Sequence, residues 1–439
     1  MKIIKKIIEY VLFRPDLHYI FSLPLNLPSI ITYKNLINNY FVYIHQKKIK
    51  QLLIIKIKIF HKIYIDILKI VYLPISLVFY FTKYRFIQVN YLQLGTICHH
   101  LSIMSKYQLQ KNKKVIVFVP KNQTFSFVLD IFKKNKNIIF VKNIFLYIIS
   151  MPLIYTNFIS CSGAIADNFY DHNAKKIGKY EWPRIYTQTK FRNTNYFKLS
   201  KNYFTKCEKI LKNKFRFKNL KKTFVMHLRE NDYINSSYIR NCNIINYKAG
   251  INFLIKKNYN IIRLTNSHDI KSDFGENYKE INTDLHQNKF LQFYLVYKSR
   301  GFICCNSGPA GMGFLLEKPL LQLNCVDIPY ALTDRSLYIP KIIKQKNIVQ
   351  SYKNLWSIDK YMQYKSIHLA IKNNYNVIEN TSDEILQAFK EFVLLLDGKK
   401  NLNLSRQDKF KKNILNQSYG HSIANISPYF FKKYNNLFT

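Results

Sequence analysis

A glycine-rich stretch at residues 300–324 constrains the fold of this chain more than any other segment. It reads RGFICCNSGPAGMGFLLEKPLLQLN and holds four of the eleven glycines, Gly301, Gly308, Gly311 and Gly313. Its pattern predicts a strand over 301–305, a turn over 306–309, a helix over 310–316 and then a further strand. In a parallel sheet such a turn lies at the carboxyl end of a strand and directs helix N–H groups toward a ligand. Phosphate groups bind at that end.

Two more predicted strands end in polar residues on the same edge. The segment KTFVMHLR (222–229) reads as a buried strand ending in His227 and Arg229, and NIIRL (260–264) reads as another. Arginine carries a permanent charge and a planar fork of donors that matches phosphate oxygens. A Ser-Gly-Pro turn also occurs in ordinary strand-to-helix connections, so a purely structural interpretation of residues 306–309 stays open. Taken together, the strand ends predict a phosphate-binding site made of His227, Arg229, Asn306, Ser307 and Gly308.

Five segments in the same order resemble a family of bacterial glycosyltransferases from surface-polysaccharide loci. They are FVMHLREND, YKAGINFLIKKNYNIIRL, the run from FLQFYLVYKSR to the glycine-rich stretch, DRSLYIPK and ISPYFFKKYNNL. The resemblance covers residues 84–435 and is densest over 222–341. It implies a nucleotide-sugar donor, a glycan or glycolipid acceptor, and Lys341 of the IPK segment as a further donor-binding residue.

Two more distant resemblances point to the two-domain GT-B fold. The His227-x-Arg229 turn is similar to the diphosphate-binding motif of fucosyltransferases, and the turn at 306–309 is similar to the donor turn of heptosyltransferases. Fucosyltransferases generally carry a second arginine where this chain has Glu230, and heptosyltransferases usually carry a histidine where it has Ala310. These departures leave the sugar and the nucleotide open.

Strands that alternate with helical stretches predict an α/β protein with parallel sheets. The expected fold class is GT-B-like, with two Rossmann-like domains whose sheets face a cleft and a basic helical segment at the amino terminus. At 439 residues the chain is long enough for two packed cores. The expected parts are a membrane-associating segment (1–83), an acceptor domain (84–215), a donor domain (216–400) and a carboxyl-terminal tail (401–439).

The amino-terminal segment combines lysines with apolar residues. Its most apolar run, IVYLPISLVFYFT (70–82), is shorter than the roughly 20 residues that span a bilayer. Six lysines between Lys47 and Lys62 favour a surface that lies on an anionic membrane. A helical hairpin packed on the first domain is an equal alternative. The expected location is cytoplasmic, on the inner face of the cytoplasmic membrane.

Two histidines follow the first predicted strand of the acceptor domain, RFIQVNYL (85–92). His99 and His100 lie in LGTICHHL, and either is a candidate general base for an acceptor hydroxyl because histidine titrates near neutrality. A structural role is the competing interpretation. The next strands are predicted over 114–119 and 137–141, and FISCSGAIADNFYD (158–171) is a candidate loop of the acceptor side.

Composition bears on the competing function classes. The formal net charge is +43, from 68 Lys and Arg against 25 Asp and Glu, which favours anionic partners. A nucleic-acid-binding protein rests on this charge alone, without a recognition motif to place it, and no nucleic-acid partner is expected. A catalytically silent glycan-binding relative is the second alternative. The chain has no Asp-x-Asp, so no metal is expected. No cofactor is expected either, because the nucleotide sugar is a substrate.

Three further features complete the prediction. The seven cysteines show no paired or metal-binding spacing, which indicates a reducing compartment, and Cys304 and Cys305 are expected to fill the core. The basic run 201–221 is expected to link the domains. Residues 381–396 predict a helix with a Thr381–Glu384 capping box and one apolar face.

Overall fold

The computed structural model divides the chain into two units by internal contacts. They comprise residues 1–129 with 134–176, and residues 130–133 with 177–439. The structure describes residues 56, 60, 63, 67, 71, 74, 81–88, 94–102, 114–118, 126–133, 135–141, 143, 146, 197–214, 220–230, 238–266, 269–326, 333, 335–356, 367–398, 405–413 and 425–438.

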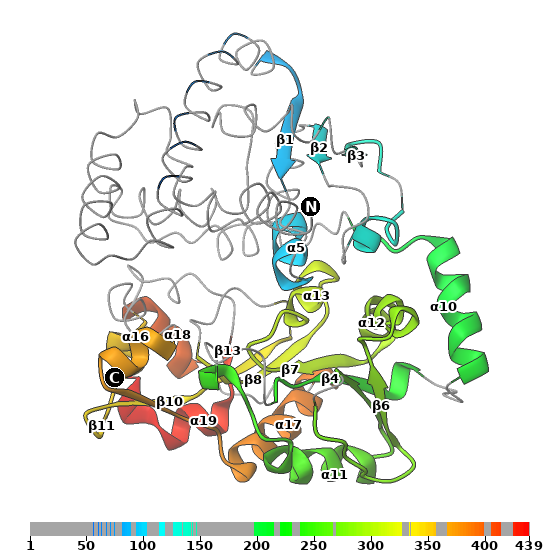
Figure 1. The fold of residues 1–439 in the computed structure, drawn as a ribbon. Helices are drawn as coiled ribbons and strands as arrows, with labels where there is room; N and C mark the ends of the chain where they lie inside the picture. The colour runs from blue at the N-terminus through cyan, green and yellow to red at the C-terminus, as the bar shows by residue number, and fades with distance from the viewer. Residues whose placement is uncertain are drawn as a thin grey trace. The chain divides into compact units, whose positions relative to one another are not determined.

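The first unit contains a three-stranded parallel sheet (Figure 1). Its elements are β1 (Tyr84–Gln88), α5 (Leu94–His100), β2 (Lys114–Phe118) and β3 (Ile138–Val141), with strand order β1-β2-β3. Val115 and Val117 of β2 are fully buried, as are Ile97 and Cys98 of α5. The predicted strands of this region are therefore confirmed. The predicted loop 158–171 lies outside the described residues.

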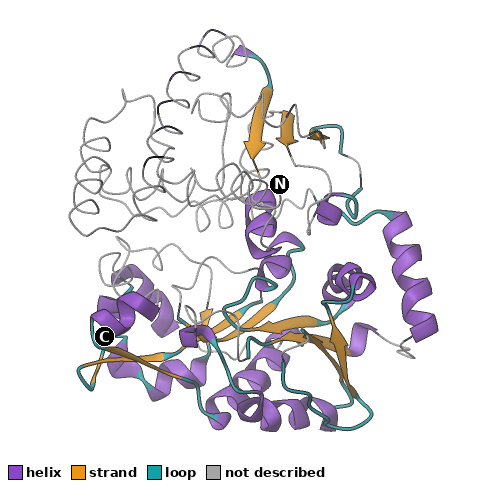
Figure 2. Ribbon diagram, viewed as in Figure 1, coloured by secondary structure: helices purple, strands orange, loops and turns teal. Residues whose placement is uncertain are grey.

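The second unit is built on a seven-stranded sheet in which every pairing is parallel (Figure 2). The strands are β4 (Thr223–His227), β5 (Asn260–Thr265), β6 (Tyr278–Asn282), β7 (Gly301–Cys304), β8 (Leu320–Cys325), β9 (Leu337–Pro340) and β13 (Asn425–Ile426). Their order is β13-β9-β8-β7-β4-β5-β6. From β6 to β9 this is the classic doubly wound strand order, in which the chain direction across the sheet reverses between the first and fourth strands. The predicted α/β class with parallel sheets is confirmed.

Helices cover both faces of this sheet. In Figure 1, α12 (His286–Lys298) and α13 (Ala310–Leu315) lie on one face, and α11 (Lys248–Lys256) and α17 (Ser382–Leu396) lie on the other. A smaller antiparallel sheet joins β10 (Ile342–Gln345), β11 (Ile348–Val349) and β12 (Tyr375–Ile378). The other helices are α10 (Lys201–Lys214), α14 (Tyr352–Leu355), α16 (Ile367–Lys372), α18 (Ser405–Asn413) and α19 (Pro428–Lys433). The 3₁₀ helices are η2 (Ser126–Leu129), η3 (Leu220–Lys222), η4 (Tyr238–Arg240), η5 (Ile244–Tyr247) and η7 (Asn435–Leu437).

Helix α17 begins and packs as its sequence predicts. The Thr381 hydroxyl accepts a hydrogen bond from the Glu384 N–H, and the Glu384 carboxylate accepts one from the Thr381 N–H. Its Phe389 ring lies against Gly250 of α11, so closely that a Cβ added there would be 2.9 Å from the ring. The two helices therefore approach through a position that only glycine fills without displacement.

The carboxyl-terminal tail is packed on the same unit. Glu391 of α17 accepts hydrogen bonds from the Ser427 hydroxyl and the Tyr429 N–H, so it holds the first turn of α19. Lys433 forms an ion pair of 2.7 Å with the buried Glu384. An aromatic cluster completes this part of the core, with Tyr352, Trp356, Phe410, Phe430, Phe431 and Phe438.

Helix α10 belongs to the segment expected to link the domains. The Tyr203 hydroxyl of α10 donates to the Phe290 carbonyl at 2.5 Å and accepts from the Tyr294 N–H at 3.1 Å. Helix α10 thus packs on α12. Its apolar face is buried, since Tyr203, Cys207 and Leu211 are all buried. Apart from residues 130–133, the second compact unit begins at Ile177, ahead of the domain boundary expected at residue 216. The boundaries at 83, 215 and 400 stay predictions.

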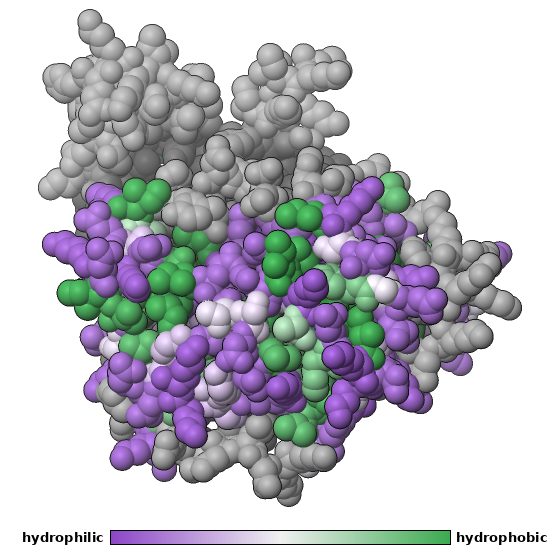
Figure 3. Space-filling model, turned by 90° about the horizontal axis from the view of Figure 1, so that it is seen from below, coloured by the Kyte–Doolittle hydropathy of each residue, from purple (hydrophilic) through white to green (hydrophobic). Residues whose placement is uncertain are grey.

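Polar side chains cover much of the described surface on the face seen in Figure 3. On the face seen in Figure 3, hydrophilic side chains surround small apolar groups. The exposed apolar residues of the second unit lie on separate elements, such as Ile245 on η5, Ile348 on β11 and Ile371 on α16. Scattered exposed apolar residues of this kind are normal for a protein surface. Within the described part of the chain, no helix is both long and apolar enough to cross a membrane.

The glycine at position 313 generates a stability prediction. A Cβ added at Gly313 would overlap the Leu320 side chain of β8, so we expect Gly313→Ala to lower the free energy of unfolding by about 1–3 kcal/mol. Urea unfolding followed by circular dichroism measures this loss. Gly308→Ala is the control, because Gly308 is exposed and a substitution there should leave stability nearly unchanged. Equal stability of the two variants would contradict the close packing of α13 on the sheet.

Candidate functional site

The candidate site lies where the strand order of the large sheet reverses. Strands β4 and β7 are neighbours, with His227 beside Cys304, but the chain leaves them toward opposite halves of the sheet. Connections that diverge in this way open a crevice at the carboxyl ends of the strands, where doubly wound proteins bind their ligands. The residues that follow β4 and β7 are the ones predicted from sequence, Arg229 after one strand and Asn306, Ser307 and Gly308 after the other.

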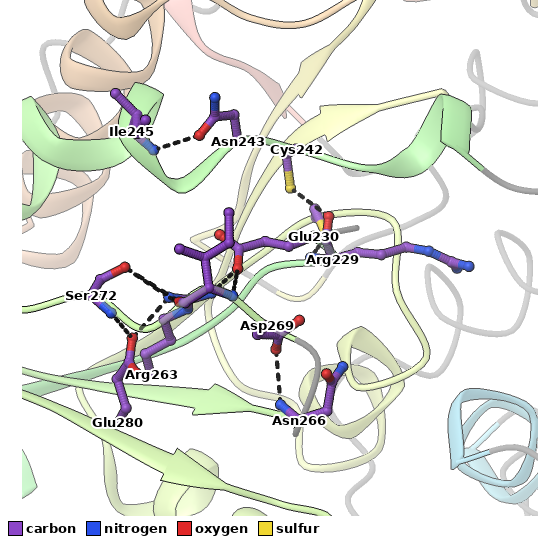
Figure 4. A network of polar contacts seen from close by, with 12 residues as sticks. Arg229, Glu230, Cys242, Asn243, Ile245, Arg263, Asn266, Asp269, Ser272 and Glu280 are labelled. Carbon is purple, nitrogen blue, oxygen red and sulfur yellow. Dashed lines mark hydrogen bonds and ion pairs between the residues drawn. The ribbon is translucent and has the colours of Figure 1, made fainter. Parts of the chain in front are cut away.

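Consecutive residues after β4 point in opposite directions. Figure 4 shows Glu230 turned into a polar network while the Arg229 side chain extends away from it. Glu230 is 3% exposed, and its Oε2 lies 2.5 Å from Nη2 of Arg263 and accepts the N–H of Ile270 at 2.8 Å. Nη1 of Arg263 lies 2.8 Å from Glu280 of β6. The network therefore ties the ends of three strands together and leaves Arg229 on the other side.

Two thiols fix the backbone of Arg229. Its N–H donates to Sγ of Cys305 at 3.1 Å, and its carbonyl accepts from the Cys242 N–H at 2.8 Å and from the Cys242 thiol at 3.5 Å. The hydrogen bond with Cys305 and burial raise the pKa of Cys242 well above its usual value, so this thiol keeps its proton and can donate. Cys304 and Cys305 are both buried, as expected. Cys305 thus fills the core and also orients the candidate ligand residue.

The turn after β7 contacts the end of β4 through two side chains. Oγ of Ser307 lies 3.0 Å from Nδ1 of His227. Burial and the positive charges of Arg263 and Arg229 lower the pKa of His227 to about 3. The imidazole is therefore neutral at physiological pH. One ring nitrogen therefore carries a hydrogen and donates a hydrogen bond, and the other has a lone pair and accepts one.

The backbone of this turn corrects one expectation. The sequence predicts several N–H groups after Ser307 that are free to bind an anion, but most of them have partners within the chain. The N–H groups of Ser307, Ala310, Gly311 and Met312 donate to nearby carbonyls, and α13 is a short helix preceded by tight turns. Among the described residues, only the N–H of Gly308 in this turn lacks an acceptor within the chain. The prediction of a row of free N–H groups is therefore wrong.

The side chains of Asn306 and Lys341 form hydrogen bonds within the protein. Oδ1 of Asn306 accepts from the Val326 N–H at 2.6 Å, which joins the turn to the end of β8. Lys341 is 2% exposed, its ammonium donates to the Asn241 carbonyl at 2.6 Å, and burial lowers its pKa. Both side chains thus support the segments around the site. Their direct contact with a ligand stays a prediction.

The loop after β5 brings a carboxylate to the same edge of the sheet. Asp269 accepts from the Asn266 N–H at 2.8 Å, and burial raises the pKa of Asp269 to about 6. The neighbouring Arg263 is fully buried in β5 and holds this loop through the Ile270 carbonyl at 2.9 Å. Arg263 was not among the residues predicted for the site. An arginine inside an otherwise apolar strand was the signal, because a buried guanidinium requires a carboxylate partner.

The acceptor-side candidates belong to the first unit. His99 and His100 form the carboxyl end of α5, and their side chains are not among those that the structure describes. Their role as a base stays a prediction. In the described residues, no three His, Cys, Asp or Glu side chains gather into a possible metal site.

The chain is similar to several solved structures, but it matches no protein-family model. No protein-family model and no curated protein matches this chain. A glycosyl transferase family 9 structure from Veillonella parvula is 10% identical, with 72% of this chain and 98% of that chain covered and a TM-score of 0.42. The ADP-heptose lipopolysaccharide heptosyltransferase II of E. coli is 9% identical, with 72% and 99% covered and a TM-score of 0.43. The E. coli heptosyltransferase WaaC with ADP is 10% identical, with 66% and 99% covered and a TM-score of 0.31.

The buried network makes a prediction about stability. Arg263→Met leaves Glu230 buried without its charged partner, so we expect the free energy of unfolding to fall by about 3–5 kcal/mol. Arg300→Met is the matched control, because Arg300 pairs with the half-exposed Asp397 at the surface and such pairs contribute about 0–1 kcal/mol. Chemical unfolding of both variants measures the difference. Similar losses of unfolding free energy in the two variants would show that the buried Glu230–Arg263 pair contributes no more to stability than the surface pair.

Proposed function

We propose that this protein is a glycosyltransferase that moves a sugar from a nucleotide-sugar donor to a surface-glycan precursor. The sequence motifs that resemble glycosyltransferases are the first support. The structural support is the position of Arg229, Ser307 and Gly308 at the point where the strand order of the large sheet reverses. That position is the single observation on which the proposal rests most heavily. The net charge of +43 over the whole chain is a second, general support, because it favours anionic partners.

The chemistry proposed for this edge is stabilisation of the leaving nucleoside diphosphate. Negative charge develops on the diphosphate as the bond to the sugar breaks, and fixed donors stabilise it most when they need no rearrangement. Arg229 suits this role, because its backbone is held by Cys305 and Cys242 while its guanidinium supplies paired donors. Arg229, Ser307 and Gly308 would perform this stabilisation without a metal, consistent with a sequence that lacks Asp-x-Asp.

The acceptor side and the location form the second part of the proposal. His99 or His100 would take the proton of the acceptor hydroxyl. The enzyme would act in the cytoplasm at the inner face of the membrane. Phe60, Ile63, Ile67 and Val71 are helical, follow one another at helical spacing and are 78%, 43%, 54% and 60% exposed. An exposed apolar stripe beside many lysines suits peripheral contact with anionic lipid.

Nucleotide binding by Arg229 is the first test. We expect one nucleoside diphosphate in a panel of UDP, GDP and ADP to raise the melting temperature of the purified protein. Arg229→Lys keeps the charge but loses the paired donors, so we expect about tenfold weaker binding with little change in stability. Arg240→Lys is the control, since Arg240 lies on η4, outside the proposed donor set. Wild-type affinity in Arg229→Lys would exclude Arg229 from the site.

Membrane contact is tested with liposomes. Because exposed charge is screened beyond roughly 8–10 Å at moderate ionic strength, we expect co-sedimentation with anionic liposomes to fall as salt rises. Phe60→Ser with Ile67→Ser should weaken the binding that remains at high salt, because the stripe loses its apolar side chains. Equal binding to neutral and anionic liposomes at every salt concentration would contradict an electrostatic contact.

A further inference from the structure

The contact between His227 and Ser307 raises a question about protons. Their atoms lie 3.0 Å apart, and one of the two must donate in this hydrogen bond. If Nδ1 of the neutral imidazole is the acceptor, the Ser307 hydroxyl donates its only proton to His227. If Nδ1 carries the proton, the imidazole donates to Oγ of Ser307 and the hydroxyl proton can turn to another acceptor. Within the chain that acceptor is the Cys305 carbonyl, 3.5 Å from Oγ, which is the long limit of a hydrogen bond and a weaker acceptor than a phosphate oxygen.

A diphosphate can use only the second arrangement. The doubly esterified diphosphate of a nucleotide sugar carries no P–OH at neutral pH, so its oxygens accept hydrogen bonds and donate none, and an oxygen lone pair of Ser307 would repel them. Most N–H groups of the turn are already committed to carbonyls within the chain. The Ser307 hydroxyl is therefore one of few donors that the turn can offer to a ligand. The direction in which this hydroxyl points matters more here than at a helix end, where several free N–H groups can bind the ligand.

We propose that His227 is a positioning residue that acts through Ser307, and that diphosphate binding selects the form of His227 protonated on Nδ1. In this form Nδ1–H donates to Oγ of Ser307, and the Ser307 hydroxyl donates to a phosphate oxygen. No net proton is gained or lost, because the same proton moves between Nε2 and Nδ1 by exchange with water. The proposal rests on the proposed function and changes the role of His227 from ligand to orienting group.

The shape of the site supports this division of roles. The His227 ring is at the end of β4 and contacts the turn after β7, so it bridges the two strands at which the strand order reverses. Burial of the ring, followed by the positive charges of Arg263 and Arg229, lowers the pKa of His227 and keeps the ring neutral. A neutral ring adds no charge of its own to the site. Its contribution is the direction of one hydrogen bond.

A double-mutant cycle tests the coupling between the two residues. The probes are inorganic pyrophosphate and the nucleoside diphosphate that wild type binds, with affinities from calorimetry. We expect His227→Phe and Ser307→Ala each to weaken binding about tenfold, and the double variant to be no weaker than either. His227→Asn should retain most of the affinity, because its amide N–H can replace the Nδ1–H donor.

A spectroscopic measurement separates positioning from a structural role. The ¹⁵N shifts of the His227 ring, assigned by their absence in His227→Asn, report which nitrogen carries the proton. We expect the Nδ1–H form to dominate when pyrophosphate is bound. The Nε2–H form in the complex, or additive losses in the cycle, would overturn the proposal. If wild type binds neither probe, the proposed function fails and this inference with it, whereas normal binding by His227→Phe overturns the inference alone. If His227→Phe does not fold, His227→Asn and the ring shifts decide the question.

Discussion

The buried ion pair between Glu230 and Arg263 is the interaction on which the candidate site depends. Removing these two charges from water costs several kcal/mol per ion, which only close pairing and further hydrogen bonds repay. Here the further bonds run to Ile270, Ser272 and Glu280, so the pair also fixes the loop after β5 and the edge strand β6. Because Glu230 is held inside, the preceding Arg229 is directed out of the network.

This arrangement separates charges that fold the protein from a charge that can bind. Arg263 is neutralised by two carboxylates within the sheet. Arg229 is held by its main chain. Its N–H donates to the Cys305 sulfur and its carbonyl accepts from the Cys242 thiol, and neither contact involves the guanidinium. A donor held in place before the ligand arrives loses less entropy on binding, which is the advantage of preorganisation in stabilising a developing charge. The glutamate that follows Arg229, in place of a second arginine, thus acts in folding.

The fold was largely predictable from sequence. Short apolar runs bounded by turn residues predicted the strands that end in His227 and Cys304, and the Thr381–Glu384 pair predicted the start of α17. These features depend on local periodicity and capping, which neighbouring residues determine. The adjacency of β4 and β7 places His227, Arg229 and Ser307 at one edge, as the order of parallel strands implies.

The details of the site depend on contacts that local patterns do not encode. Cys305 was expected to fill the core, but its sulfur also accepts the Arg229 N–H across 76 positions of sequence. Lys341 was expected at the ligand, which stays a prediction, and its ammonium also donates to the Asn241 carbonyl, a contact that the sequence did not indicate. The N–H groups after Ser307 were expected to be free, but tight turns before α13 supply them with acceptors. Each outcome depends on which partner folding brings near, so composition and spacing could not predict it.

The central claim is that a nucleoside diphosphate binds at the carboxyl ends of β4 and β7. The most direct measurement is a crystal structure of the full-length protein with the nucleoside diphosphate that stabilises it. We expect phosphate oxygens within hydrogen-bond distance of the Arg229 guanidinium, the Ser307 hydroxyl and the Gly308 N–H. A nucleotide bound at another edge of the sheet, with Arg229 and Ser307 in contact with solvent alone, would contradict it.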